Sequence, residues 1–293
     1  QRAHRHLGGL VCLENEWRSA LSMLMQFYWA VIRRESVKLL KQRDRLAAAM
    51  VRPVLWLWII GGGMQALAGG DYTARLLPGI VGMTLLFGGM VGGLSIALDK
   101  DAGTMRLLVT APVKTHHILI AKTLGAAIGA LVQMGLLIVL LLALEGLYTL
   151  LFPLGFDLQN VLPWVGRTLW PQLHVLLPGA ALAALACAAL GVLCGTFAKS
   201  IDGFAVMMNF VIFPVFFFSG ALYPIEPMPA LARWVALVNP FSYCVDLLRH
   251  AFSSHAEFGL MFATLVLLGA TVAMLTVATW KFSQSGAAVP LNQ

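Results

Sequence analysis

Six stretches of this sequence contain no Asp, Glu, Lys or Arg, and each is long enough to cross a lipid bilayer as a helix. They are residues 53–70, 76–98, 123–144, 168–198, 203–225 and 258–280. A hydrocarbon core about 30 Å thick needs roughly 20 apolar residues, and a helix satisfies its own backbone hydrogen bonds there. The sequence therefore predicts an all-α membrane protein with six transmembrane helices. Transport, anchoring and chemistry on lipid are the function classes that fit such a chain.

The basic residues indicate how the chain is oriented in the membrane. Only 11% of residues are charged, against roughly 25% in soluble proteins. With a cytoplasmic N-terminus and six crossings, all but four of the 20 Lys and Arg lie inside, and the four outside are Arg75, Arg167, Arg233 and Arg249. Cytoplasmic loops carry the excess of Lys and Arg. We therefore expect both termini in the cytoplasm, contact with membrane lipid, and no nucleic-acid partner despite the net charge of +7.

The sequence divides into an N-terminal cytoplasmic or interfacial segment, a six-helix transmembrane domain and a C-terminal cytoplasmic tail, at residues 1–48, 49–281 and 282–293. In the first segment Arg34, Lys38, Lys41 and Arg45 repeat at helical spacing, which predicts a helix lying along the membrane surface. Two interpretations stay open. The helix either anchors the chain on lipid headgroups or docks a cytoplasmic partner.

The loop between the second and third predicted spans, residues 99–117, is longer and more patterned than a linker needs. Acidic residues precede Gly103, apolar side chains flank Arg106, and Pro112 ends the pattern. These features predict a short amphipathic helix that binds a cytoplasmic partner. A helix lying on the membrane surface is the alternative.

The residues of this loop resemble the coupling helix of ATP-binding-cassette (ABC) transporter permeases of the second membrane-domain type. The resemblance rests on Asp99, Asp101, Gly103, Thr104, Met105, Arg106, Leu107, Leu108, Thr110 and Pro112. Further similarities are Arg33, Arg34 and Glu35 ahead of the first span, Arg52-Pro53 at its start, Ser219 to Pro224 after the fifth, and Asn239-Pro240. They follow the family's order from about residue 22 to 281.

The resemblance implies the permease subunit of an exporter in a bacterial inner membrane. The chain has no GxxxxGK[ST] phosphate loop, so ATP and Mg are expected on a partner ATPase in two copies, and the chain itself is not expected to be an enzyme. A second permease copy, as a homodimer, and a hydrophobic, amphipathic or lipid-like cargo are also implied. None of the four Cys has metal-binding spacing, so no metal site is predicted.

Two alternatives to small-molecule export remain open, together with a scaffold that transports nothing. The first is export of a lipid-linked polysaccharide by the same architecture. The second is a membrane-embedded lipid-modifying enzyme that uses His116, His117 or His174. The charge-free spans argue against a proton-coupled carrier, because such carriers need buried acids.

An outer hairpin is expected at residues 223–257, where four prolines interrupt the apolar pattern. Asn239 is a good N-cap and Pro240 suits the first helical position, so a helix is predicted to begin there. By resemblance the hairpin is a partly re-entrant outer gate formed by Tyr223, Pro224, Glu226, Pro229, Asn239, Pro240, Asp246 and Arg249. The last two residues are interpreted either as a latch or as an ordinary exposed pair worth about 0.3 kcal/mol.

Apolar side chains within the spans give candidates for the substrate pathway, and packing or lipid contact is the alternative. These candidates are Trp56, Phe87, Met90, Phe213 and Phe217. Glycine pairs spaced by four residues, including Gly88 with Gly92 and Gly89 with Gly93, predict close helix contacts within the chain or between two copies. The outer loop 145–172 is longer than the family's, so a tolerated insertion is expected there.

Overall fold

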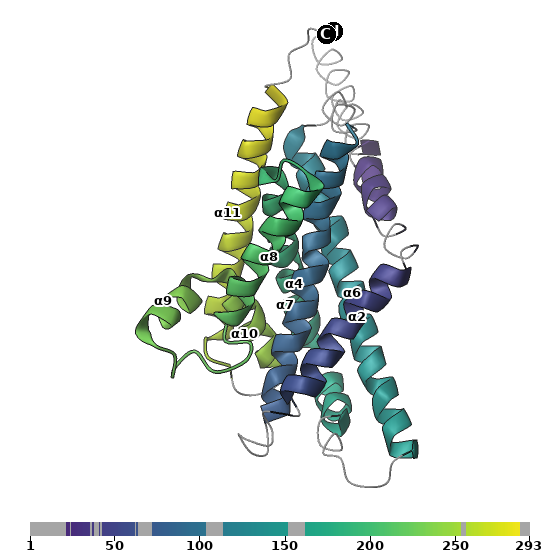
Figure 1. Ribbon diagram of the computed structural model, residues 1–293, viewed down its shortest axis with the longest axis vertical. Helices are drawn as coiled ribbons and strands as arrows, with labels where there is room; N and C mark the ends of the chain where they lie inside the picture. Colours follow the sequence, from purple (N-terminus) through teal and green to yellow (C-terminus); the bar gives the residue numbers. More distant parts are fainter. Residues whose placement is uncertain are drawn as a thin grey trace, which may run out of the picture.

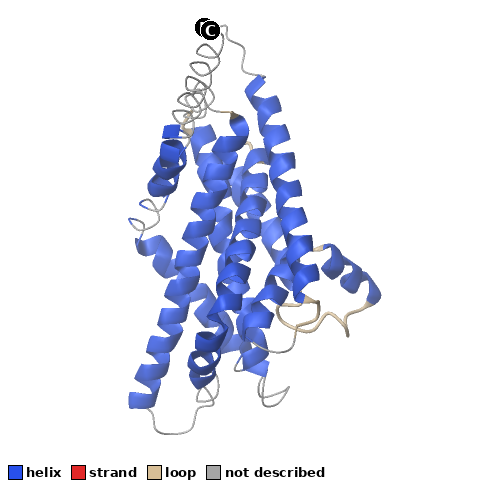
Figure 2. Ribbon diagram, turned by 180° about the vertical axis from the view of Figure 1, so that it is seen from behind, coloured by secondary structure: helices blue, strands red, loops and turns tan. Residues whose placement is uncertain are grey.

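The computed structural model describes residues 22–23, 25–35, 37, 41, 43–61, 63, 72–103, 114–151, 162–252 and 256–287. All regular structure in these ranges is helical (Figure 2). The elements are α2 (Arg43–Trp56), the π-helix η1 (Leu57–Gly61), α4 (Tyr72–Asp101), α6 (Thr115–Leu151), α7 (Leu162–Phe197), α8 (Ile201–Phe217), α9 (Ala230–Val238), α10 (Pro240–Phe252) and α11 (Leu260–Ala287). Residues 25–35 are also helical and are called the N-terminal helix below.

Within the described ranges, four helices are long and apolar enough to cross a membrane, and they confirm the all-α membrane class. Their apolar spans are Arg75–Asp101, Thr115–Leu144, Gln172–Phe197 and Leu260–Gln284. Two shorter apolar helices, Ala49–Gly61 and Ile201–Phe217, lie where the first and fifth spans were predicted. Residues 64–70, at the predicted end of the first span, lie outside the described residues.

The fifth predicted span, 203–225, is too long at its C-terminal end. Helix α8 ends at Phe217, and a turn follows in which Gly220 has φ +79°. Pro214 in the last turn of α8 cannot donate a helical hydrogen bond, and Gly220 adopts the left-handed conformation that other residues avoid. The apolar run therefore continues into a turn rather than a helix.

The loop predicted at 99–117 is shorter than expected because helices extend into it from both sides. Helix α4 continues to Asp101, and α6 begins at Thr115 instead of near residue 118. His116 and His117 therefore lie in the first turn of α6 rather than in the loop predicted at 99–117. Residues 104–113, which hold most of the predicted coupling helix, lie outside the described residues.

Helix α4 lies at the centre of the bundle (Figure 1). Its most apolar stretch is 83% buried, whereas that of α11 at the edge is 17% buried. Helix α7 makes the most extensive contact with α4, α6 packs beside both, and α11 packs on α7. Helices α4, α7 and α11 end at one end of the bundle, here called the Asp99 end, and α9 and α10 lie toward the opposite end, here called the α10 end (Figure 1).

The glycine pairs of α4 are occupied by contacts within the chain. A Cβ atom built on Gly93 would lie 2.0 Å from the Gly191 carbonyl oxygen of α7, and one on Gly89 would lie 2.5 Å from the carbonyl carbon of Cys187. On the neighbouring face, a Cβ on Gly88 would lie 2.8 Å from the Ala130 Cα of α6. Small residues thus let α4 approach two helices at backbone distance, which selects intrachain packing for these positions.

Candidate functional site

A cluster of charged and polar side chains joins three helices at the Asp99 end. We call Arg34, Glu35, Ser95, Asp99 and Lys122 the charge junction. Asp99 is 4% exposed and Lys122 is 3% exposed. The Lys122 Nζ donates to Asp99 Oδ2 at 2.5 Å, and the Arg34 Nη2 donates to Asp99 Oδ1 at 3.1 Å. A buried carboxylate is stable only when its charge is paired, so Asp99 holds α6 and the N-terminal helix against α4.

Ser95 extends the charge junction by one turn of α4. Its Oγ accepts from Lys122 Nζ at 2.9 Å and donates to Glu35 Oε1 at 3.1 Å. Ser95 and Asp99 are four residues apart, so both side chains lie on the same face of the helix. The result is a continuous chain of polar contacts from Glu35 through Ser95, Lys122 and Asp99 to Arg34.

The N-terminal helix follows α6 for two turns. Near its start the Tyr28 hydroxyl lies 2.8 Å from His117 Nδ1. Near its end Glu35 packs on Gly125, where an added Cβ would lie 3.1 Å from the Glu35 Cβ. The contacts advance in the same direction along both helices, so the two helices run parallel. Gly125 therefore provides space for a partner element that the sequence alone did not assign to it.

The last residues of α4 bind two further helices. The Lys100 Nζ donates to the carbonyl oxygens of Gly195, Thr196 and Ala198 at 2.9, 2.7 and 2.8 Å. These carbonyls belong to the C-terminal end of α7, where a cation is favourable because several carbonyls lack helical partners. Asp101 Oδ2 accepts from the Ile201 N–H at 3.1 Å, at the first residue of α8.

Asp99, Lys100 and Asp101 together connect the end of α4 to α6, α7, α8 and the N-terminal helix. The chain then leaves α4 through Ala102 and Gly103, whose φ of +67° suits glycine. The predicted coupling residues at 104–113 follow directly. Any displacement of that loop is therefore applied to a helix end that is bonded to four other elements.

The structure brings together some of the predicted coupling residues. Arg34, Glu35 and Asp99 meet in the charge junction, Asp101 caps α8, and Arg33 is exposed. Thr104, Met105, Arg106, Leu107, Leu108, Thr110 and Pro112 lie outside the described residues. Sequence reasoning missed Ser95, Lys100 and Lys122. The sequence places Lys122 directly before an uncharged stretch of 22 residues, 123–144, but α6 begins at Thr115 and so carries Lys122 two turns inside the helix.

A second polar cluster lies at the α10 end, and we call Asp246, Arg249 and Glu257 the hairpin network. Asp246 Oδ1 and Oδ2 accept from the backbone N–H groups of Glu257 and Phe258 at 2.7 and 3.2 Å. The Arg249 Nη1 donates to Glu257 Oε1 at 2.6 Å, and its Nη2 donates to the Gly220 carbonyl. This network ties α10 to the segments before and after the hairpin.

Glu257 also binds the segment that follows α8. Its two carboxylate oxygens accept from the Ile225 N–H at 3.1 and 3.0 Å. The side chains of Asp246 and Arg249 are therefore joined through Glu257, which the sequence had not singled out. Asp246 is 1% exposed and Arg249 is 8% exposed, so the interpretation of an exposed surface pair was wrong.

Asp99 and Asp246 are buried acids that lie outside the predicted charge-free stretches. Asp99 is paired with Lys122, within helices that run past the charge-free stretches. Burial raises the pKa of Asp246 above its ordinary value, and the hydrogen bonds from Glu257 and Phe258 and the nearby His250 and Arg249 oppose this rise. Both acids are bonded to fixed partners.

Of the remaining gate residues, Asn239 and Pro240 lie at the corner between α9 and α10, and the others precede α9. Helix α10 begins at Pro240 as predicted, and Asn239 Oδ1 accepts from the Phe241 N–H at 3.0 Å. The Asn239 Nδ2 donates to the Val215 carbonyl of α8 at 2.6 Å. Pro229 directly precedes α9, whereas Tyr223, Pro224 and Glu226 are exposed. The Asn239 side chain therefore caps α10 and joins it to α8.

The candidate pathway residues separate into two groups. Trp56 of α2 contacts the Phe217 ring at a centroid distance of 6.0 Å, and Phe213 stacks on Phe217 at 6.2 Å. Phe87 lies elsewhere, with the Arg52 guanidinium 3.8 Å from its ring centroid, and Met90 is 1% exposed in the core. Trp56, Phe213 and Phe217 thus form one aromatic surface to which Phe87 and Met90 do not belong.

Both clusters lie largely in a part of the chain that matches a known protein family. The sequence profile described as ABC-2 type transporter matches residues 26–253, which include the charge junction and most of the hairpin network. The chain belongs to the ABC-2 type transporter family. This confirms the resemblance inferred from the loop between the second and third spans.

Relatives of this ABC-2 chain include proteins named for nodulation and for transport. Nodulation protein J of Rhizobium leguminosarum bv. trifolii is 26% identical over 216 residues, 72% of this chain and 74% of that protein. Inner membrane transport permease YadH of Escherichia coli (strain K12) is 24% identical over 273 residues, 90% and 98% of the two chains. Inner membrane transport permease YhhJ of the same organism is 25% identical over 196 residues, 66% and 47%. The family and the apolar helices together identify an ABC-2 membrane transport permease.

Proposed function

We propose that this chain is the transmembrane subunit of an ATP-driven exporter, with ATP and Mg bound by a separate ATPase subunit. Family membership supports this proposal, because ABC-2 permeases usually work with an ATPase partner. The cargo proposed is a hydrophobic or amphipathic small molecule, or a lipid-like one, that leaves the cytoplasm or the inner leaflet. The aromatic surface around Phe217 is consistent with such cargo.

The observation that carries the proposal is the set of bonds at the end of α4. Asp99, Lys100 and Asp101 bind four other elements directly before the predicted coupling loop. In the proposed mechanism the ATPase pushes this loop when it binds ATP, and the side chains at the end of α4 transmit the movement to the bundle. Such coupling requires an element with two discrete arrangements, and both the ATPase and the transport pathway must shift the equilibrium between them.

We further propose six crossings, with the Asp99 end in the cytoplasm. The segment α2–η1 (43–61) and helix α8 (201–217) supply the first and fifth crossings beside the four longer helices. At 1.5 Å per residue, 17 to 19 residues reach about 26–28 Å, close to the hydrocarbon thickness. The hairpin network then lies on the outer side, where it closes the pathway. The functional unit proposed is a homodimer on two ATPase copies.

Purification from native membrane tests the proposal. The wild-type chain is expected to bring an ATP-hydrolysing subunit with it. Leu107→Glu is expected to lose that subunit while the helices remain inserted, because a charge replaces an apolar contact of the predicted coupling helix. Gly259→Trp is the control, since an added Cβ at Gly259 has nothing within 4 Å and the residue lies at the α10 end. Full ATPase association and transport in Leu107→Glu would refute the coupling role.

A further inference from the structure

One arginine lies on the surface of the bundle, halfway along α4. Helix α2 crosses the bundle over α4 and α6 (Figure 1). On α2 the side chain of Arg52 is exposed, and its guanidinium carbon lies 3.8 Å from the centroid of the Phe87 ring of α4. A cation over an aromatic ring is attracted to the face of that ring, so Phe87 holds the guanidinium in place.

The position of Phe87 gives the depth of this charge. The charge-free stretch of α4 is bounded by Arg75 and Asp99, and Phe87 is twelve residues from each, or about 18 Å along the helix. The guanidinium therefore lies near the middle of the apolar layer, although Arg52 directly precedes the uncharged stretch 53–70 in the sequence. An ionisable side chain at this depth is costly, and in membrane proteins it marks a functional site.

Arg52 has no anionic partner in the described part of the chain. No hydrogen bond or ion pair joins its guanidinium to another described residue. All 13 acidic residues lie outside the six uncharged stretches. The acid of α2 itself, Asp44, is eight residues earlier, or about 12 Å along the helix. A charge in apolar surroundings is stable only when it is paired, so the site lacks an anion.

The aromatic surface of Trp56, Phe213 and Phe217 begins next to this charge. Trp56 follows Arg52 by four residues on α2, so the two side chains lie on the same face of the helix. The Trp56 ring in turn contacts the Phe217 ring of α8. Phe213 is 54% exposed and Phe217 is 37% exposed. The surface beside the guanidinium is therefore open to an apolar molecule.

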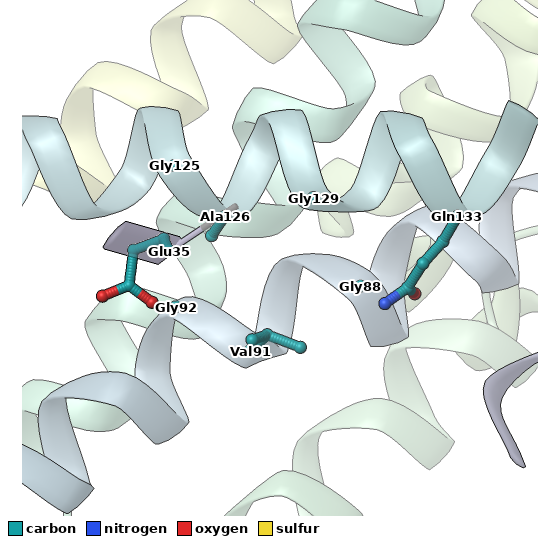
Figure 3. Close-up of a pocket in the computed structure, with 8 residues that line it drawn as sticks. All are labelled: Glu35, Gly88, Val91, Gly92, Gly125, Ala126, Gly129 and Gln133. Atoms are coloured by element: carbon teal, nitrogen blue, oxygen red, sulfur yellow. The ribbon is translucent and has the colours of Figure 1, made fainter. Parts of the chain in front are cut away.

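The interface between α4 and α6 is closed to such a molecule. Figure 3 shows Gly88 and Gly92 of α4 beside the narrow pocket that remains between the two helices. A Cβ atom added at Gly88 would lie 2.8 Å from the Ala130 Cα of α6, so the helices meet at backbone distance there. A ligand of Arg52 therefore lies over α2 and α8 instead of between α4 and α6.

We propose that Arg52 binds the anionic group of an amphiphilic cargo, and that the hydrocarbon part of the cargo lies on the aromatic surface. The planar guanidinium donates two parallel hydrogen bonds to a carboxylate or a phosphate. The ends of the charge-free stretch are about 18 Å away, so the anion belongs to a molecule held within the apolar layer. The inference rests on the proposed function, because it names the class of cargo and takes α2 to lie in lipid.

The test uses the full chain in phosphatidylcholine nanodiscs, with dodecyl phosphate as the probe and 1-dodecanol as its uncharged partner. A ligand that binds only the folded state raises Tm saturably. Dodecyl phosphate is expected to raise Tm of the wild type, and 1-dodecanol is not. Arg52→Gln is expected to lose this shift, and Arg52→Lys to keep part of it, because lysine retains the charge without the planar fork. Arg75→Gln, which removes an exposed arginine at the end of the same stretch of α4, keeps the full shift.

The ligand-free Arg52→Gln variant distinguishes an unpaired charge from a structural one. Its Tm is expected to equal or exceed that of the wild type, because the variant no longer holds an unpaired charge in the apolar layer. A marked fall in Tm would mean that the protein or a second copy supplies the anion, and it would overturn the proposal. Equal shifts with the two probes, or an unchanged dodecyl phosphate shift in Arg52→Gln, would overturn it as well.

Two supporting results distinguish the sources of the anionic molecule. An anionic phospholipid that co-purifies with the wild type but not with Arg52→Gln identifies a lipid of the bilayer. Dodecyl phosphate binding without any such lipid identifies an amphiphile taken up from solution. ATPase association is measured in the same preparations. Its loss in the wild type would count against the proposed function, whereas absence of the dodecyl phosphate shift in the wild type counts against the site at Arg52.

Discussion

The charge junction and the hairpin network each bury a carboxylate, but they satisfy it in different ways. Asp99 is held by cations of two other elements, Lys122 and Arg34, which are 23 and 65 residues away in the sequence. Asp246 is held by backbone N–H groups 11 and 12 residues further along the chain. The charge junction therefore fixes how distant helices lie against one another, whereas the bonds of Asp246 fix the local path of the chain that follows α10.

This difference fits the roles proposed for the two ends. Bonds between side chains of separate helices depend on the positions of those helices, so movement of α4 changes the charge junction directly. The bonds from backbone N–H groups to Asp246 lie within the hairpin, so they depend less directly on how the long helices are positioned. A junction of the first kind suits transmission, and a network of the second kind suits a closed gate.

The largest effect is expected from breaking the buried pair of the charge junction. Asp99→Asn leaves Lys122 buried without its carboxylate, which we expect to cost about 3–5 kcal/mol in the free energy of unfolding. Arg34→Gln is the control. Its side chain is 46% exposed, so its removal is expected to cost less than about 1 kcal/mol. Denaturant unfolding in nanodiscs measures both changes.

The double variant Asp99→Asn/Lys122→Met sharpens this prediction. It removes both charges, so it is expected to recover most of the stability lost in Asp99→Asn while coupling to the ATPase stays impaired. An Asp99→Asn protein within about 0.5 kcal/mol of the wild type would show that Lys122 does not depend on this carboxylate.

A smaller loss is expected from the hairpin network. Glu257→Gln leaves Arg249 without its carboxylate partner and weakens two bonds to the Ile225 N–H. We expect a cost of about 1.5–3 kcal/mol and faster hydrogen exchange at Ile225. Glu226→Gln changes an exposed residue near the same segment and is expected to be neutral. Equal exchange at Ile225 in the two variants would refute the assigned role of Glu257.

Loss of the Lys100 contacts is expected to destabilise only the C-terminal end of α7. Lys100→Met leaves the carbonyls of Gly195, Thr196 and Ala198 without their cation, at a cost of about 1 kcal/mol. Hydrogen exchange should rise in the last turn of α7 and stay unchanged at the α10 end. Lys199→Met, an exposed neighbour, serves as the control. A similar rise in that variant would mean that the cap is not specific to Lys100.

The smallest effect is a dependence of hairpin stability on pH. Burial raises the pKa of Asp246 in the folded hairpin, so the folded state keeps this proton at pH values where the unfolded chain has lost it. The stabilisation is fully present below the ordinary carboxyl pKa and is lost as the pH rises through the raised value. Asp246→Asn should flatten the change of Tm across this window. An identical pH profile in the variant would refute the assignment.

Much of the fold could be predicted from uncharged runs and local signals. The runs at 76–98 and 123–144 lie within α4 and α6, and Asn239-Pro240 correctly marked the start of α10. Local rules work there because lipid excludes charge from a span and because a cap acts within a few residues. They failed at the end of α8, where the helix stops near Pro214 and Gly220 although the apolar run continues, and at Lys122, whose charge did not end its helix.

The candidate sites were less predictable, since their partners are remote in the sequence. Asp246 and Arg249 were identified, but Glu257, which joins them in space, was not, and Lys122 was not recognised as the partner of Asp99. A side chain reveals its own chemistry in the sequence, whereas its partner depends on how helices pack. The same limit left the alternatives for Gly88 and Gly89 open until α6 and α7 were seen against them.

The sequence by itself determined that this protein is a helical membrane permease, because the hydrophobic effect acts on each apolar run separately and the family's residues follow one another in order. Only the tertiary structure decided which charges meet, since Arg34, Asp99 and Lys122 come from three helices whose register the sequence does not state.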